Sequence, residues 1–118
     1  MSNSEKQTEC LEACYGKAAA LEKLVAYAAD SIVSKTLLDE PIGTITLFAF
    51  DKGQRLSEHT APFDAVVQVV DGHGVVTIDG EDHTVATGEI VIMPANIPHA
   101  VRAEQKFKML LTMIRTKK

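Results

Sequence analysis

The sequence predicts an all-β fold: an antiparallel β-barrel that carries an N-terminal α-helical arm. Two patterns in the sequence support this prediction. From residue 30 onward, the apolar pattern has a period of two and turn residues recur at short intervals, which is typical of antiparallel strands. Before residue 30, helix-forming residues dominate and apolar residues recur at helical spacing. We therefore divide the 118-residue chain into a helical arm over residues 1–29 and one barrel domain over residues 30–118.

The predicted arm carries two apolar stripes that each fit one face of a helix. The first comprises Leu11, Cys14, Tyr15 and Ala18, and the second comprises Leu21, Leu24, Val25 and Ala28. Gly16 lies between Tyr15 and the second stripe, where it breaks or bends the helix. An amphipathic segment of this kind needs a surface to cover, so we expect it to pack on the barrel or on a partner subunit.

The two cysteines, Cys10 and Cys14, lie four residues apart and share one face of the predicted helix. A disulfide within one helical turn has poor geometry, and no nearby histidine completes a zinc site. Free cysteine often serves as a small buried apolar residue. We therefore favour two free thiols, and a redox or soft-metal role is the alternative.

Eight segments of the barrel domain are predicted as strands, because β-branched and aromatic residues are enriched in them and turn residues separate them. They are residues 31–38, 44–50, 63–70, 74–78, 82–86, 89–93, 99–103 and 107–114. Asp79–Gly80 is a strong signal for a two-residue hairpin turn. Short strands with close-set turns and no intervening helices indicate an antiparallel barrel or sandwich.

The composition is that of an ordinary globular protein, with 46% hydrophobic and 24% charged residues. The formal net charge of −4 and the lack of a long basic run argue against nucleic acid and anionic membranes as partners. The sequence has no run of about 18 apolar residues, so it predicts no transmembrane helix. The polar, acidic N-terminus differs from a signal peptide, and we expect a cytoplasmic protein.

Two histidines are the candidate functional residues. His59 lies near the end of a predicted barrel segment, and His99 follows the loop Pro94–Pro98, whose two prolines fix the direction of the next strand. A small barrel has an interior that is filled by side chains or holds one small ligand. Inward-facing polar groups are therefore informative, and we expect this pair to form the site.

The spacing around these histidines resembles that of the cupin family. In the family's first motif a glycine precedes a histidine by six positions, as Gly53 precedes His59, and a second glycine closes the motif, as Gly72 does. The second motif is matched at Gly88, Pro94 and His99. The resemblance covers roughly residues 31–114 and implies a jelly-roll barrel that forms a homodimer.

The cupin metal site uses two histidines and a glutamate from the first motif and a histidine from the second. By that resemblance, His59 and His99 are metal ligands here, whereas Ala61 and Ala65 occupy the other two ligand positions. Asn96 and Ala103 replace a glycine and an asparagine of the second motif. The resemblance thus implies at most a weakly held divalent metal ion of open identity, and no organic cofactor.

Other polar residues are poor replacements for the missing ligands. Asp64, Gln68 and Glu58 should face away from the site, because strand side chains alternate. His73 and His83 lie next to turns and are expected to be solvated or at a hairpin edge.

The methionines offer a second kind of ligand. Met109 and Met113 share one face of the last predicted strand with Leu111, and Met93 precedes the proline loop. Histidine with methionine suits copper(I), but such a stripe is more often core packing, which we favour.

These observations favour a small-molecule-binding, cupin-type barrel centred on His59 and His99, and they leave open whether it is an enzyme. The alternative is a metal-free, non-catalytic module that binds or senses a ligand. A third hypothesis is a structural oligomer without a pocket. Ala61 and Ala65 favour the metal-free module over a full oxygenase, and they should widen the cavity, which disfavours the third hypothesis.

Overall fold

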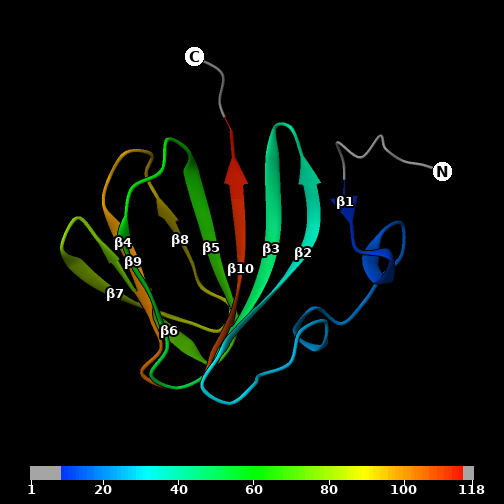
Figure 1. The fold of residues 1–118 in the computed structure, drawn as a ribbon, viewed down its shortest axis with the longest axis horizontal. Coiled ribbons are helices and arrows are strands. Elements are labelled where there is room, and N and C mark those ends of the chain that lie inside the picture. Colours follow the sequence, from blue (N-terminus) through cyan, green and yellow to red (C-terminus); the bar gives the residue numbers. More distant parts are fainter. Residues whose placement is uncertain (1–8, 116–118) are drawn as a thin grey trace.

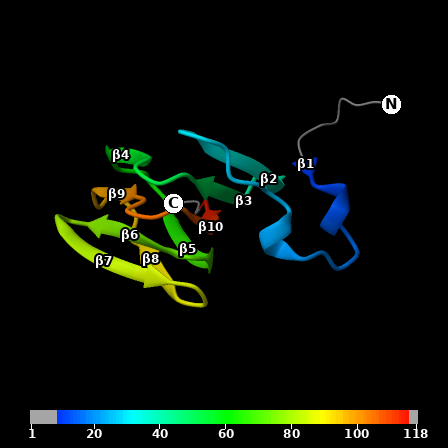
Figure 2. The ribbon, with the colours of Figure 1, turned by 90° about the horizontal axis from the view of Figure 1, so that it is seen from below.

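The computed structural model describes residues 9–115, which form two antiparallel β-sheets that face each other (Figure 1). The larger sheet has the strand order β1-β2-β3-β10-β5-β8, and the smaller one has the order β4-β9-β6-β7. The strands are β1 (Glu9–Cys10), β2 (Ile32–Glu40), β3 (Gly43–Phe50), β4 (Arg55–His59), β5 (Asp64–Asp71), β6 (His73–Ile78), β7 (Glu81–Ala86), β8 (Ile90–Met93), β9 (His99–Arg102) and β10 (Phe107–Ile114). Figure 2 shows the four-stranded sheet on one side of the molecule and β1 and β2 on the other.

The all-β fold predicted from the alternating pattern is confirmed, and so is the antiparallel pairing of its strands. The hairpin signal at Asp79–Gly80 is also confirmed, because Ile78 pairs directly with Glu81 across it. Asp79 and Gly80 both have positive φ, 52° and 83°, as a type I′ turn requires. β4 was not predicted from the sequence, because its residues show no clear alternation of apolar and polar side chains. Leu56 is half-buried, and the other four residues of the strand are exposed.

The prediction of an N-terminal α-helix is wrong for the described residues. Residues 1–8 of the predicted arm lie outside the described part, and residues 9–29 contain β1 and two short 3₁₀ turns, Glu12–Cys14 and Leu21–Lys23. Gly16, with φ of 74°, has the left-handed conformation that interrupts a helix. The segment instead runs along the outer face of the large sheet, and sheet packing overrides its helical propensity.

The second apolar stripe packs on this outer face. Val25 is buried with Leu47 and Ala49 of β3. Leu21, Leu24 and Tyr27 pack at its edge. The spacing that suggested a helix therefore reflects contacts with a sheet.

Polar contacts fasten the same segment to the sheet. The Tyr27 hydroxyl donates a hydrogen bond to Asp71 Oδ2 at 2.5 Å. Lys108, only 8% exposed, donates from its ammonium group to the carbonyl oxygen of Glu22. The ammonium groups of Lys106 and Lys108 lie 5.0 and 4.9 Å from the centroid of the Tyr27 ring, within cation–π range.

The cysteines do not share a helical face, because Cys10 lies in β1 and Cys14 ends the first 3₁₀ turn. Cys14 is a free thiol, and its Sγ donates to the carbonyl oxygen of Leu11 at 3.6 Å.

The main core lies between the sheets. Phe50 and Phe107, both fully buried, stack with ring centroids 4.8 Å apart. Gly74 of β6 faces the Phe107 ring so closely that a Cβ at this position would lie 2.4 Å from the ring. The core is therefore tightly packed at the end where the aromatic rings lie.

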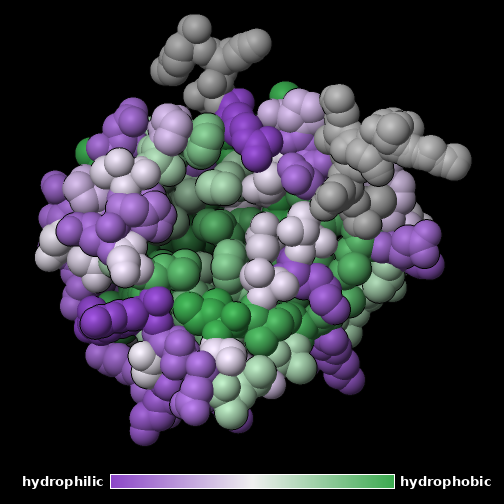
Figure 3. Space-filling model, viewed as in Figure 1, coloured by the Kyte–Doolittle hydropathy of each residue, from purple (hydrophilic) through white to green (hydrophobic). Residues whose placement is uncertain are grey.

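One face of the molecule remains partly apolar. Figure 3 shows hydrophobic residues gathered around a hollow in the middle of this face, with hydrophilic residues around them. Some apolar side chains that pack on the main core are only half-buried, including Phe48, Leu56, Leu111 and Met113. Within residues 9–115, no helix has the length and apolar character needed to cross a membrane.

Candidate functional site

The structure brings His59 and His99 together at one end of the space between the sheets. His59 ends β4, His99 begins β9, and the two residues are paired across these neighbouring strands. Their ring centroids lie 4.5 Å apart and the ring planes meet at 75°. Two imidazoles far apart in the sequence thus form one edge-to-face pair.

The loop before His99 is held in place by two hydrogen bonds, one to the segment that joins β4 to β5 and one to the first residue of β5. The backbone N–H of Asn96, which has a φ of 65°, donates to the Ala61 carbonyl oxygen at 2.7 Å. The backbone N–H of Ala95 donates to Asp64 Oδ1 at 2.9 Å. The segments that follow β4 and begin β5 therefore fix the approach of the chain into His99.

Each imidazole is oriented by a backbone carbonyl two residues earlier. His59 Nδ1 lies 2.8 Å from the carbonyl oxygen of Ser57, and His99 Nδ1 lies 3.1 Å from that of Ile97. A carbonyl oxygen only accepts hydrogen bonds, so Nδ1 carries the proton in both contacts. In the neutral form, each Nε2 keeps its lone pair, which is how metal-binding and proton-accepting histidines are commonly arranged.

The two rings differ in exposure. His99 is 3% exposed, whereas His59 is exposed. Burial lowers the pKa of His99 below its ordinary value, and the nearby His59 lowers it further, although the bond to Ile97 opposes both effects. His99 is therefore a neutral base near pH 7.

A cavity of about 60 Å³ lies beside the pair. Besides the two histidines, it is lined by Leu56, Ala61, Ala65, Met93, Val101, Met109, Leu111 and Met113. This space holds a few water molecules or a few ligand atoms, and it is well below the roughly 300–1,000 Å³ of drug-sized pockets. Ala61 and Ala65 do line it, as expected, but the methionines beside them keep it small.

The polar residues considered as replacement ligands do not line this cavity. Asp64, Gln68 and Glu58 are exposed, as strand alternation predicts. His73 is half-buried at the start of β6, and exposed His83 lies 4.0 Å from Glu81. Among residues 9–115, no three His, Cys, Asp or Glu side chains come close enough to hold a metal ion.

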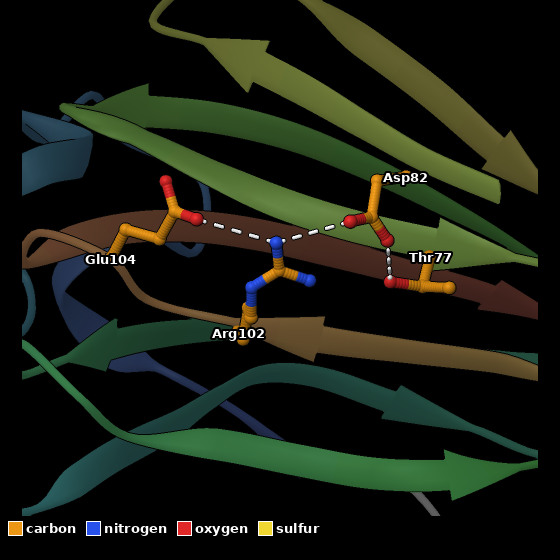
Figure 4. Close-up of polar contacts among 4 residues, drawn as sticks. All are labelled: Thr77, Asp82, Arg102 and Glu104. Carbon is orange, nitrogen blue, oxygen red and sulfur yellow. Dashed lines mark hydrogen bonds and ion pairs between the residues drawn. The ribbon is translucent and has the colours of Figure 1, made fainter. Parts of the chain in front are cut away.

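A polar network that the sequence analysis missed lies on the outer face of the small sheet (Figure 4). Arg102 Nη2 donates to Asp82 Oδ2 at 3.1 Å and to Glu104 Oε2 at 3.3 Å. Thr77 donates to Asp82 Oδ1 at 2.6 Å, and this bond, followed by Arg102, lowers the pKa of Asp82. The network links β6, β7 and β9, and both ion pairs of Arg102 stabilise this sheet.

Two facing antiparallel sheets with a histidine pair at one end of their interior define a small β-barrel of the kind that carries the two-histidine spacing found in the sequence. The cupin domain model matches residues 46–115, and the chain belongs to the cupin family. This confirms the resemblance to the cupin family found in the sequence.

Solved structures show the same relationship. A conserved protein of unknown function from Streptococcus pyogenes is 35% identical, with a TM-score of 0.86 over 98% of this chain and 100% of that one. A cupin 2 conserved barrel domain protein from Leptotrichia buccalis is 46% identical (TM-score 0.79), and the match covers 80% of this chain but only 46% of that one. A cupin superfamily protein from Desulfitobacterium hafniense shares the fold. It is 22% identical, with a TM-score of 0.85 over 92% of this chain and 99% of that one. No curated protein sequence matches the chain.

Proposed function

We propose that this protein binds a small molecule through the Nε2 atoms of His59 and His99. The observation that carries the proposal is the pair itself: two imidazoles 4.5 Å apart that line one cavity, each held at Nδ1 by a carbonyl oxygen. Both Nδ1 atoms are already used, so the Nε2 atoms are the polar groups available to a ligand.

The cavity indicates what kind of ligand fits. A neutral Nε2 accepts a hydrogen bond, and the lowered pKa of His99 disfavours the imidazolium that would attract an anion. The remaining lining is apolar, and the space is about 60 Å³. We therefore favour a ligand of few atoms that donates hydrogen bonds, such as a small hydroxyl or enol compound, over a carboxylate.

The divalent metal site of the family fits these residues poorly. Ala61 and Ala65 line the cavity but carry no donor atom, so two of the four family ligands are missing. Protein zinc sites use about three or four protein ligands, and non-haem iron sites add a carboxylate to two histidines. We propose at most a weakly held divalent ion, completed by water or by the ligand.

The alternative function is a metal-free binding or sensing module without catalysis. The absence of any carboxylate from the cavity lining favours it. The two functions differ in whether His99 takes a proton from its ligand, because a buried neutral imidazole is a suitable general base.

We also propose a homodimer. Ile90 and Ile92, on the edge strand β8, are 58% and 55% exposed, and the hollow in the face shown in Figure 3 is surrounded by hydrophobic residues. Exposed edges and apolar patches are usually covered by a partner. Sedimentation equilibrium tests this, and a monomer at micromolar concentration would contradict it.

The ligand site is tested by thermal unfolding of the untagged protein with small diols, hydroxyketones and the ions Mn²⁺, Fe²⁺, Ni²⁺ and Zn²⁺. We expect at least one hydroxyl compound to raise the Tm of the wild type but not of His99→Ala. His83→Ala is the matched control, because His83 does not line the cavity. Equal stabilisation of all three proteins would show that binding occurs elsewhere.

A further inference from the structure

Three thioethers line the same cavity as the two imidazoles, and together they carry an inference about the ligand. Met93 and Met109 are 3% and 1% exposed, and Met113 is half-buried. All three contribute to the cavity beside His59 and His99. We propose that this cavity binds a soft monovalent cation, copper(I), through His59, His99 and the methionine sulfurs.

The strand register explains how the methionines gather there. Met113 of β10 is paired with Ala65 of β5, and Ala65 is paired with Met93 of β8. The three residues form one row across the large sheet, and alanine stands between the two methionines. Because Ala65 projects only a methyl group, both thioethers can extend over it toward the cavity.

The histidines approach from the opposite sheet. His59 and His99 form a paired row on β4 and β9, and facing sheets lie about 10 Å apart. Side chains as long as histidine and methionine can meet midway across such a gap. Nitrogen donors from the small sheet and sulfur donors from the large sheet thus line one cavity of about 60 Å³.

The chemistry of the donors selects the ion. Thioethers are soft ligands that favour copper(I), whereas Mn²⁺ and Mg²⁺ prefer oxygen donors. No charged side chain lines the cavity, so an ion brings its whole charge into apolar surroundings. The Born cost of that transfer rises with the square of the charge, which favours a monovalent cation over a divalent one.

Methionine is also a common core filler, so the sulfurs must be tested separately from the packing. The test is anaerobic titration of the whole protein with copper(I) in competition with the chromogenic chelator bicinchoninate. Met93→Leu, Met113→Leu and the double variant remove sulfur while nearly conserving volume. Thermal unfolding of each variant checks that it is folded.

We expect one copper(I) per chain, and affinity that falls at least about tenfold in each leucine variant and in His99→Ala. His83→Ala should bind like the wild type. The inference is overturned if the wild type fails to compete with the chelator, or if the double leucine variant binds copper(I) as tightly as the wild type.

This inference rests on the proposed function, since it uses the same two histidines, but the two can fail separately. If copper(I) fails to bind while a hydroxyl ligand still stabilises the wild type and not His99→Ala, the copper site is wrong and the ligand site stands. If copper(I) binds and no organic compound does, the cavity is a metal site alone. If neither binds, both proposals are wrong.

Discussion

His59 and His99 are paired across β4 and β9 with their rings 4.5 Å apart, yet one ring is exposed and the other is buried. This asymmetry predicts different costs of substitution. His99→Ala should destabilise the fold by about 1–3 kcal/mol, because it leaves a gap and removes the partner of the Ile97 carbonyl. His59→Ala should change stability by no more than about 0.5 kcal/mol. Urea unfolding measures both, and equal costs would contradict the asymmetric site.

The lowered pKa of His99 predicts a pH dependence of stability. The unfolded chain takes up a proton near the ordinary histidine value of 6.5, whereas folded His99 resists protonation until lower pH. The contribution of neutral His99 to the free energy of unfolding is therefore full above pH 6.5. It is lost as the pH falls through the pKa of folded His99.

Urea titrations across this range should show that stability falls less steeply with decreasing pH in His99→Gln than in the wild type. His83→Gln serves as the control, because His83 is exposed and away from the cavity. Identical slopes in His99→Gln and the wild type would mean that the folded protein accepts the proton freely.

The hydroxyl of Tyr27 fastens the N-terminal segment to Asp71, and burial together with this bond raises the Tyr27 pKa. Tyr27→Phe should cost about 1–2 kcal/mol, because it removes a hydrogen bond to a charged group at a partly buried position. It should also speed proteolysis within residues 16–30, while the sheets stay protected.

Tyr15→Phe is the matched control for this change. Tyr15 is 63% exposed, so the loss of its hydroxyl should alter neither stability nor cleavage. If Tyr27→Phe behaves like Tyr15→Phe, the apolar contacts of Val25 and Leu24 hold the segment without the hydrogen bond.

Gly74 faces the buried Phe107 ring, and an added Cβ would lie 2.4–2.8 Å from three ring carbons. Gly74→Ala should therefore cost about 1–3 kcal/mol or more, since Phe107 is stacked on Phe50 and cannot move freely. Gly80→Asn is a suitable comparison, because nothing lies within 4 Å and asparagine tolerates positive φ. A Gly74→Ala variant as stable as Gly80→Asn would mean that the core is loosely packed.

The sequence predicted the parts of the fold that depend on local pattern. Alternation located most strands, and the Asp79–Gly80 turn followed from its need for positive φ. The N-terminal segment was misread, because the spacing of Leu21, Leu24 and Val25 suits a helix and also suits packing on a sheet. Only the tertiary contacts decide between these two structures.

The candidate site could also be predicted only in part from the sequence. The motif spacing placed His59 and His99 in one region, and the structure pairs them. The row of Met113, Ala65 and Met93 could not be read from the sequence, because it depends on the register between three strands that are distant in the chain. The carbonyl contacts that fix both Nδ1 atoms likewise depend on backbone geometry.

The central claim is that the Nε2 atoms of His59 and His99 are free and act as one site. Long-range ¹H–¹⁵N NMR of the imidazoles tests it most directly, at about pH 8, where ordinary histidines are neutral. We predict protonated Nδ1 and unprotonated Nε2 in both rings, and selective shifts of both Nε2 signals when copper(I) or a stabilising hydroxyl compound is added. Protonated Nε2 atoms, or ligand shifts confined to His73 and His83, would contradict the account.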